Sequence, residues 1–213
     1  MQTIVFDFDG TLLNSKRRHQ GVLYDAISEF CGSTPNLILD DFVEYKANGY
    51  STRDYLQNKL KFSLHDAGSI TEYWKLYIEK PGYLKQDVLY DDSISTLDLL
   101  FGNYYLVLLS ARQNKDMLYQ QLVKFGVDKY FENIICVDPL KAISEKKVSM
   151  EKKPDIILYV GDTEVDYEAA GKIPFFALNR GFRNKNYWDL RRINSFNNLS
   201  YLPEVIKKIS GGT

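Results

Sequence analysis

The stretch that decides the fold is IVFDFDGTLL, residues 4–13, close to the start of the chain. Its apolar first half predicts a buried strand, which ends on Asp7, Asp9 and Gly10. Alternate residues of a strand share a face, so both carboxylates are expected together, at the sheet edge where parallel α/β proteins bind ligands. A divalent cation such as Mg²⁺ would relieve their repulsion and leave one oxygen free as a nucleophile. A turn with an Asx cap explains Asp9 and Gly10, but not Asp7.

Length and composition indicate a folded α/β protein. The 213 residues are 45% hydrophobic and 26% charged, enough for one α/β domain with a smaller insertion and unlike a disordered chain. The net charge of −1 gives no basic field for nucleic acid or an anionic membrane. Cys31 and Cys136 lie in apolar stretches and suit reduced thiols. Because we find neither a signal-peptide pattern nor a membrane-spanning run, we expect a cytoplasmic protein.

The pattern of apolar residues changes along the chain. Between residues 17 and 79 it predicts only helices, with Ser51 and Ser63 as N-caps. From residue 91 helices alternate with strands, which predicts a parallel sheet with right-handed crossovers. We therefore expect a Rossmann-like parallel sheet core, with helices on both faces, in residues 1–15 and 83–213, and an inserted helical cap domain in residues 16–82. The later strands are expected at 104–109, 133–137, 156–160 and 174–178.

A second strand ends on acids in the stretch GDTEVD, residues 161–166. Asp162 is placed to join Asp7 around a cation, and Asp166 lies one helical turn further along. Acids at a helix N-terminus also interact favourably with the helix dipole, which would explain Asp162 and Glu164 without any function. Two acidic strand ends in one sheet favour the metal site.

A third strand end carries Ser110, Ala111 and Arg112. A hydroxyl together with the backbone N–H groups of a helix N-terminus can cradle a phosphate group. Ordinary helix capping also explains Ser110, and the two roles are compatible. These residues are therefore candidate phosphate ligands.

These three motifs resemble those of the haloacid dehalogenase-like (HAD) hydrolases, in the branch of the phosphoglycolate phosphatases and β-phosphoglucomutases with a type-1 helical cap. Residues 7–12 are similar to the family's DxDGT motif, and residues 161–166 to its GDxxxD motif. The resemblance implies that Asp7 is the nucleophile and Asp9 the general acid and base. It also implies Mg²⁺ held by Asp7, the Asp9 backbone carbonyl and Asp162, with Asp166 as a supporting residue.

The resemblance extends to substrate contacts and to a lysine that neutralises the nucleophile. Ser110 would bind the phosphoryl group, and Arg53 of the cap would contact the leaving group, unless it is a surface arginine. For the lysine we favour Lys147, then Lys146, then Lys141, with Ser144 as the helix cap and with Val148 and Met150 facing the core. The remaining candidate substrate contacts are Gly10, Thr11, Ala111 and Arg112.

The function that the resemblance implies is a Mg²⁺-dependent phosphatase, acting on a small phosphorylated metabolite through an aspartyl-phosphate. Asp9 favours a phosphatase over a dehalogenase, because an alkoxide leaving group needs a proton and a halide does not. Three alternatives stay open: a phosphomutase of the same fold, a 2-haloacid dehalogenase, and a fold relative that only binds ligands. The sequence indicates neither the physiological substrate nor the oligomeric state.

Overall fold

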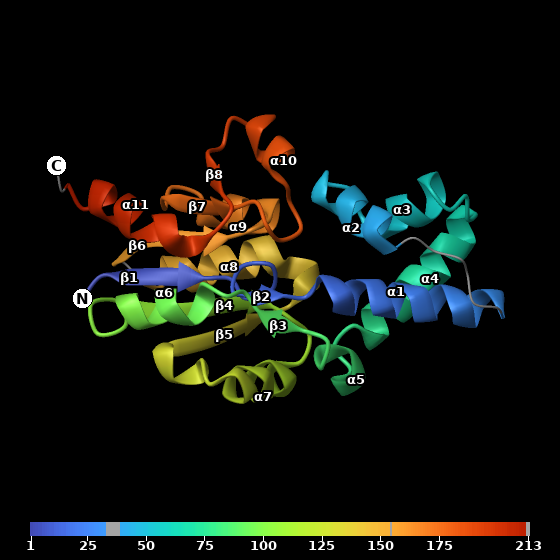
Figure 1. Ribbon diagram of the computed structural model, residues 1–213, viewed down its shortest axis with the longest axis horizontal. Helices are drawn as coiled ribbons and strands as arrows, with labels where there is room; N and C mark the ends of the chain where they lie inside the picture. The colour runs from blue at the N-terminus through green and yellow to red at the C-terminus, as the bar shows by residue number, and fades with distance from the viewer. Residues whose placement is uncertain (33–38, 154, 212–213) are drawn as a thin grey trace.

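A parallel sheet has the strand of the first motif at its centre (Figure 1). The computed structural model describes residues 1–32, 39–153 and 155–211, and within them this sheet has six strands. Each strand runs parallel to its neighbours, as the alternation of helices and strands predicts. In their order across the sheet the strands are β5 (Asn133–Val137), β4 (Tyr105–Ala111), β1 (Thr3–Phe6), β6 (Ile156–Gly161), β7 (Phe175–Leu178) and β8 (Ser195–Phe196).

Helices cover both faces of the sheet, because successive side chains of a buried strand point to opposite faces. Ile4 and Phe6 belong to the hydrophobic cluster that includes side chains of α6, α7 and α11. Val5 belongs to the cluster on the other face, with side chains of α8 and α9. The helices of the core are α6 (Ser93–Leu100), α7 (Lys115–Phe125), α8 (Ala142–Glu151), α9 (Glu164–Ala170), α10 (Lys185–Asp189) and α11 (Leu202–Ile209). Within the described residues, three short 3₁₀ helices accompany them: η1 (Asp128–Tyr130), η2 (Pro139–Lys141) and η3 (Leu199–Tyr201).

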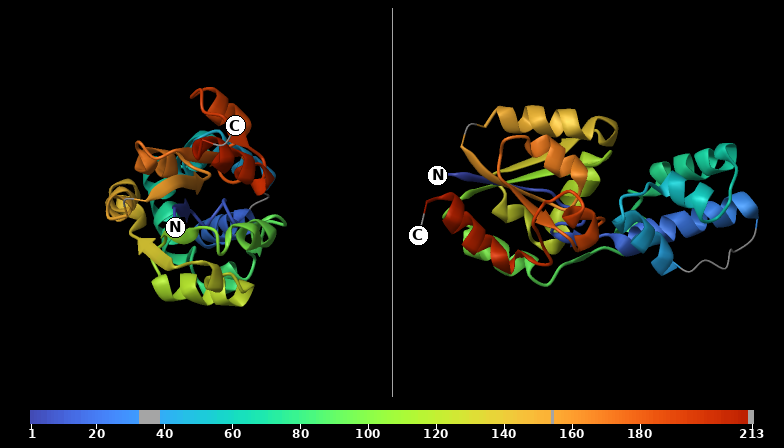
Figure 2. Two further views of the ribbon diagram at one scale, coloured as in Figure 1. Left: turned by 90° about the vertical axis from the view of Figure 1, so that its left-hand side faces the viewer. Right: turned by 90° about the horizontal axis from the view of Figure 1, so that it is seen from above.

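A helical insertion lies beyond the carboxyl end of β1 and packs around its own hydrophobic cluster (Figures 1 and 2). Its helices α3 and α4 begin at the predicted N-caps, since Ser51 and Ser63 each accept a hydrogen bond from the backbone three residues later. A two-stranded antiparallel ribbon of β2 (Leu13–Asn14) and β3 (Val88–Leu89) connects the insertion to the core. The helices of the insertion are α1 (Lys16–Cys31), α2 (Leu39–Ala47), α3 (Thr52–Asn58), α4 (Leu64–Tyr77) and α5 (Pro81–Leu84).

The predicted fold class is confirmed, and several elements match their expected limits. The strand at 133–137 is found as predicted, and that at 156–160 extends by one residue. The connecting ribbon and the elements after residue 178 were not predicted. The strands β2, β3 and β8 have two residues each, which is too short to show a period. The limits of the cap, residues 16–82, stay a prediction. In the described part of the chain, no helix combines the length and the hydropathy that a membrane span requires.

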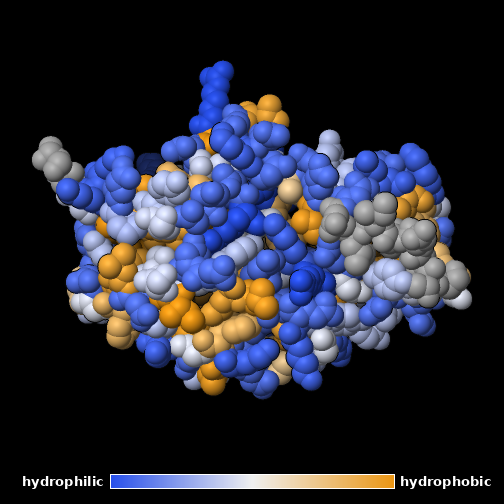
Figure 3. All heavy atoms as spheres, viewed as in Figure 1, coloured by the Kyte–Doolittle hydropathy of each residue, from blue (hydrophilic) through white to orange (hydrophobic). Residues whose placement is uncertain are grey.

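The surface is mainly hydrophilic in the view of Figure 3, with hydrophobic residues gathered over the lower half of the core. Ile94 and Leu99 of α6 and the following Phe101 are among the exposed large hydrophobic residues. The insertion and the core meet at the side where β1, β4 and β6 end, and the candidate site lies there.

Candidate active site

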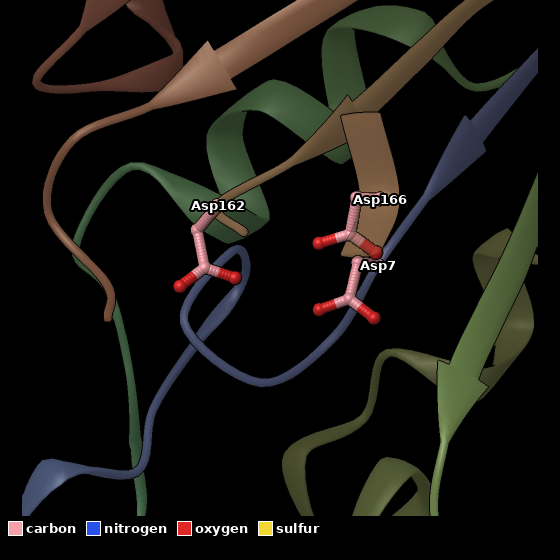
Figure 4. A group of neighbouring side chains, drawn as sticks. All are labelled: Asp7, Asp162 and Asp166. Carbon is pink, nitrogen blue, oxygen red and sulfur yellow. The ribbon is translucent and has the colours of Figure 1, made fainter. Parts of the chain in front are cut away.

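Three carboxylates meet beyond the carboxyl ends of β1 and β6, which are neighbouring strands at the centre of the sheet. Asp7 directly follows β1, and Asp162 directly follows β6. Asp166 lies in the first turn of α9. Figure 4 shows the three side chains in one group, and an oxygen of each lies within 4.8 Å of the others. All three are buried, so their charges interact more strongly than they would in water.

Two glycines allow the chain to wrap closely around Asp162. A Cβ atom at Gly10 would lie 2.1 Å from Asp162 Oδ2, and one at Gly181 would lie 1.9 Å from the same atom. Gly10 also has a φ of 82°, which favours glycine. The Phe182 N–H donates a hydrogen bond of 2.7 Å to Asp162 Oδ2. The loop after β7 therefore fixes one carboxylate oxygen and leaves the other for a ligand.

The electrostatics of this group fit a divalent cation. Burial raises the pKa of Asp162 well above its ordinary value, and the charges of Asp7 and Asp166 raise it further. Burial also raises the pKa of Asp7 to about 7, against the lowering effect of Lys146. Asp162 Oδ1 is buried and has no hydrogen-bond partner among the residues that the structure describes. Carboxylate oxygens in this arrangement are ligands that Mg²⁺ prefers.

The lysine that contacts Asp7 is Lys146, and not Lys147, which we favoured from the sequence. Lys146 Nζ lies 2.8 Å from Asp7 Oδ1 and 2.6 Å from Asp166 Oδ1, whereas Lys147 and Lys141 are exposed. Although burial lowers it, the charges of Asp166 and Asp7 raise the pKa of Lys146 well above its ordinary value. Lys146 is therefore an ammonium group at neutral pH.

The error lay in the register of α8. This helix begins at Ala142 and not after Ser144, and its buried residues are Ala142, Lys146 and Met150, each four positions apart. Val148 is 49% exposed. Positions two apart differ by about 200° around a helix, so Val148 and Met150 cannot both face the core. The face that contains Met150 therefore also contains Lys146.

Tyr159 belongs to the same group and was not predicted. Its hydroxyl donates to Asp166 Oδ1 over 2.7 Å and accepts from Lys146 Nζ over 3.0 Å. Thr163 adds a hydrogen bond of 2.8 Å to Asp166 Oδ2. Both oxygens of Asp166 are thus engaged inside the protein, while Asp162 keeps a free one. Asp166 is placed to orient Lys146 rather than to bind a metal.

Asp9 is not a member of this group of three carboxylates, and it pairs with two arginines. Arg112 Nε lies 2.6 Å from Asp9 Oδ2, and Arg18 pairs with the other oxygen. Arg112 also bonds to Gln121, at 2.7 Å. Asp87 completes a ring, since it accepts from Gln121 at 2.7 Å and lies 3.3 Å from Arg18. Although burial raises it, the Arg112 and Arg18 charges lower the pKa of Asp9 below its ordinary value.

The remaining predicted contacts divide between two cavities. Ser110, Ala111 and Arg112 line a cavity of about 800 Å³ together with Asp7 and Lys146. The guanidinium of Arg112 is engaged by Asp9 and Gln121. The role of Ser110, Ala111 and Arg112 as phosphate ligands stays a prediction.

Arg53 lines a second cavity, of about 510 Å³, beside the first. Gly10 lies directly against the Asp162 side chain. The Thr11 carbonyl accepts a hydrogen bond of 2.8 Å from Arg180. The structure therefore brings the motif residues of the core together and places Arg53 in the neighbouring cavity.

The raised pKa of Asp162 has an effect on the stability of the fold that can be measured. An acid whose pKa is raised on folding binds its proton more tightly in the folded state, so stability falls as the pH rises past the unfolded value near 4. In EDTA at pH 8, Asp162→Asn should therefore melt at a higher temperature than the wild type, and the difference should shrink toward pH 5. Mg²⁺ should raise the melting temperature of the wild type only. Equal Mg²⁺ shifts in both proteins, measured by calorimetry, would contradict the metal site.

The chain has an α/β core with a helical insertion and an acidic centre at its strand ends, and the comparisons specify the family. The model of the family described as haloacid dehalogenase-like hydrolase matches residues 4–175. The chain therefore belongs to the haloacid dehalogenase-like hydrolases. A comparison with curated proteins gave no match.

Solved structures share the fold at low sequence identity. One is described as a predicted phosphatase from Clostridium acetobutylicum, 20% identical, with a TM-score of 0.74 and coverage of 97% of this chain and 98% of that one. A haloacid dehalogenase-like family hydrolase from Streptococcus pneumoniae is 17% identical, with a TM-score of 0.72 and coverage of 96% and 98%. A predicted phosphoglycolate phosphatase from Haemophilus somnus is 19% identical, with a TM-score of 0.71 and coverage of 97% and 98%.

Proposed function

We propose that the protein is a Mg²⁺-dependent phosphatase that hydrolyses a small phosphorylated metabolite through an aspartyl-phosphate. The observation that carries the proposal is the buried contact of Lys146 with both Asp7 and Asp166, beside Asp162 with its free oxygen. This group opens into a cavity that Ser110 also lines. Carboxylates held between a lysine and a cation site are suited to phosphoryl transfer, in which positioning and charge stabilisation supply most of the catalysis.

Each residue of the group has a role in the proposed reaction. One oxygen of Asp7 attacks phosphorus, so a bond from the carboxylate to phosphorus forms as the bond to the ester oxygen breaks. Lys146 holds the other oxygen, which orients the nucleophile, and Asp166 and Tyr159 hold Lys146 in turn. Ser110 binds the phosphoryl oxygens. Mg²⁺, held by Asp7, the Asp9 carbonyl and Asp162, would supply further charge neutralisation when bound.

Asp9 serves both steps as acid and base. It gives a proton to the leaving oxygen and then takes one from the water that hydrolyses the aspartyl-phosphate. In this structure both of its oxygens are paired with arginines, which stabilises the carboxylate that the second step requires. In the first step the ester oxygen must replace one arginine as the partner of protonated Asp9. The helical insertion, residues 16–82, would act as a cap that covers the site.

The need for a divalent cation is the most accessible test. Hydrolysis of p-nitrophenyl phosphate should require Mg²⁺, because Asp162 Oδ1 is buried without a partner among the described residues. EDTA should remove the activity and excess Mg²⁺ should restore it, as measured by release of p-nitrophenolate. Full activity after EDTA treatment and gel filtration would refute the proposed cofactor. Release of free phosphate from sugar phosphates, rather than its transfer to a second position, would separate a phosphatase from a phosphomutase.

A further inference from the structure

The catalytic cavity is larger than a phosphate with a short leaving group would fill. Its volume of about 800 Å³ lies within the range of about 300–1,000 Å³ that pockets for drug-sized ligands have. From Asp7 and Ser110 it extends outward between α4 of the insertion and η2 of the core. A substrate that reaches Asp7 therefore has its leaving group in this outer part.

The outer part has apolar side chains on both sides. Leu76 of α4 is 65% exposed and Leu140 of η2 is 82% exposed, and both line the cavity. Ile78 lines it as well. Single exposed leucines are common on protein surfaces. Leu76 belongs to the insertion and Leu140 to the core, and both line the same cavity. Together they form a surface that an apolar ligand would bury.

Outside the acidic group around Asp162, charged side chains of the cavity have partners within the protein. Glu79 accepts hydrogen bonds of 2.8 Å from the backbone N–H groups of Gln113 and Asn114. Lys75 lies 2.8 Å from Glu72 at the rim. The two arginines of the cavity, Arg18 and Arg112, pair with Asp9. The hydroxyl groups of a sugar would compete with these partners for hydrogen bonds, whereas an alkyl chain would leave the interactions unchanged.

His19 does not change this conclusion, although it also lines the cavity. Its Nδ1 atom has no partner among the described residues, but that atom is buried. The imidazole ring packs between Trp74 and Phe182, with ring centroids 5.2 and 4.4 Å away. The rings of Trp74 and Phe182 therefore add apolar surface to the wall of the cavity.

We infer that the alcohol part of the substrate is apolar: a phosphomonoester of an alkyl or aryl alcohol whose carbon chain lies against Leu76 and Leu140. The inference rests on the proposed phosphatase function and adds the substrate class. It distinguishes this protein from a phosphatase for sugar phosphates or other hydroxylated metabolites.

The test compares n-hexyl phosphate with glucose 6-phosphate, which have equal carbon counts, at saturating Mg²⁺. The kcat/KM for n-hexyl phosphate should exceed that for glucose 6-phosphate at least about tenfold, as expected when two or more methylene groups become buried. It should also exceed the kcat/KM for ethyl phosphate by a similar factor. Equal values, or a preference for glucose 6-phosphate, would overturn the inference.

Variants locate the preference in the structure. Leu76→Asp and Leu140→Asp should each lower the ratio of kcat/KM for n-hexyl over ethyl phosphate by about tenfold, since a carboxylate would be desolvated by the chain. Leu190→Asp is the matched control, because Leu190 is 83% exposed and is not part of the cavity wall among the described residues. An unchanged ratio in both cavity variants would reject the assignment of these leucines.

The two proposals fail in different ways. If p-nitrophenyl phosphate is hydrolysed with Mg²⁺ but n-hexyl phosphate has no advantage, only the apolar substrate class is wrong. If none of these esters is hydrolysed, the phosphatase function is wrong and the substrate class is rejected with it.

Discussion

Asp7→Asn should lower the turnover of p-nitrophenyl phosphate by about 1,000-fold or more, because an amide cannot attack phosphorus and the covalent step is lost. The fold should remain. Burial raises the pKa of Asp7 to about 7, so its ionised form costs stability that a neutral amide does not. The variant should therefore melt at the same temperature as the wild type or higher in EDTA at pH 8. The measurement is phosphate release, with circular dichroism as the check on folding.

A folded Asp7→Asn variant that releases phosphate at the wild-type rate would contradict the nucleophile assignment. Asn133→Asp is a suitable control for an exchange between aspartate and asparagine on the sheet, because Asn133 is exposed at the start of β5. That substitution should change the rate by less than about threefold, as surface substitutions usually have small effects.

Lys146→Ala should lower the rate by about 100-fold or more, as loss of one preorganised charge-stabilising group typically does. It should also destabilise the fold by about 3–5 kcal/mol, because Asp7 and Asp166 are then buried without their cation. The rate should therefore be measured at a temperature where thermal melting shows the variant to be folded. Lys146→Arg keeps the charge and should retain most of the stability.

Lys147→Ala and Lys141→Ala are the matched controls on the same segment. Both lysines are exposed, so each substitution should change the rate by less than about threefold. A dead Lys147→Ala variant beside an active Lys146→Ala variant would mean that the register of α8 described above is wrong. If all three variants were fully active, phosphoryl transfer at this centre would itself be in doubt.

The sequence predicted the parts of the site that follow from strand ends. Asp7 and Asp162 lie where buried strands stop, and parallel strands bring such positions to one edge, so their proximity follows from topology alone. The N-caps at Ser51 and Ser63 were also predictable, because a cap is a local hydrogen bond.

The remaining contacts depend on packing between distant segments. Choosing Lys146 over Lys147 required the register of α8. The sequence analysis placed Met150 in the core, which selects Lys146 four residues earlier, but it also placed Val148 there, about 200° away around the helix. Arg18 of the insertion meets Asp9 of the core only in the folded protein. Nothing in the sequence around Phe182 indicates that its N–H binds Asp162, since a backbone group has no sequence signature.

The aspartyl-phosphate is tested most directly by trapping it. The enzyme with Mg²⁺ and p-nitrophenyl phosphate should be quenched with borohydride, which reduces an acyl phosphate to an alcohol, and then digested for peptide mass spectrometry. We predict homoserine at position 7 in the wild type, and none without substrate or in Asp7→Asn. Unmodified Asp7 in an enzyme that hydrolyses the ester throughout the labelling, or homoserine at another aspartate, would contradict Asp7 as the nucleophile.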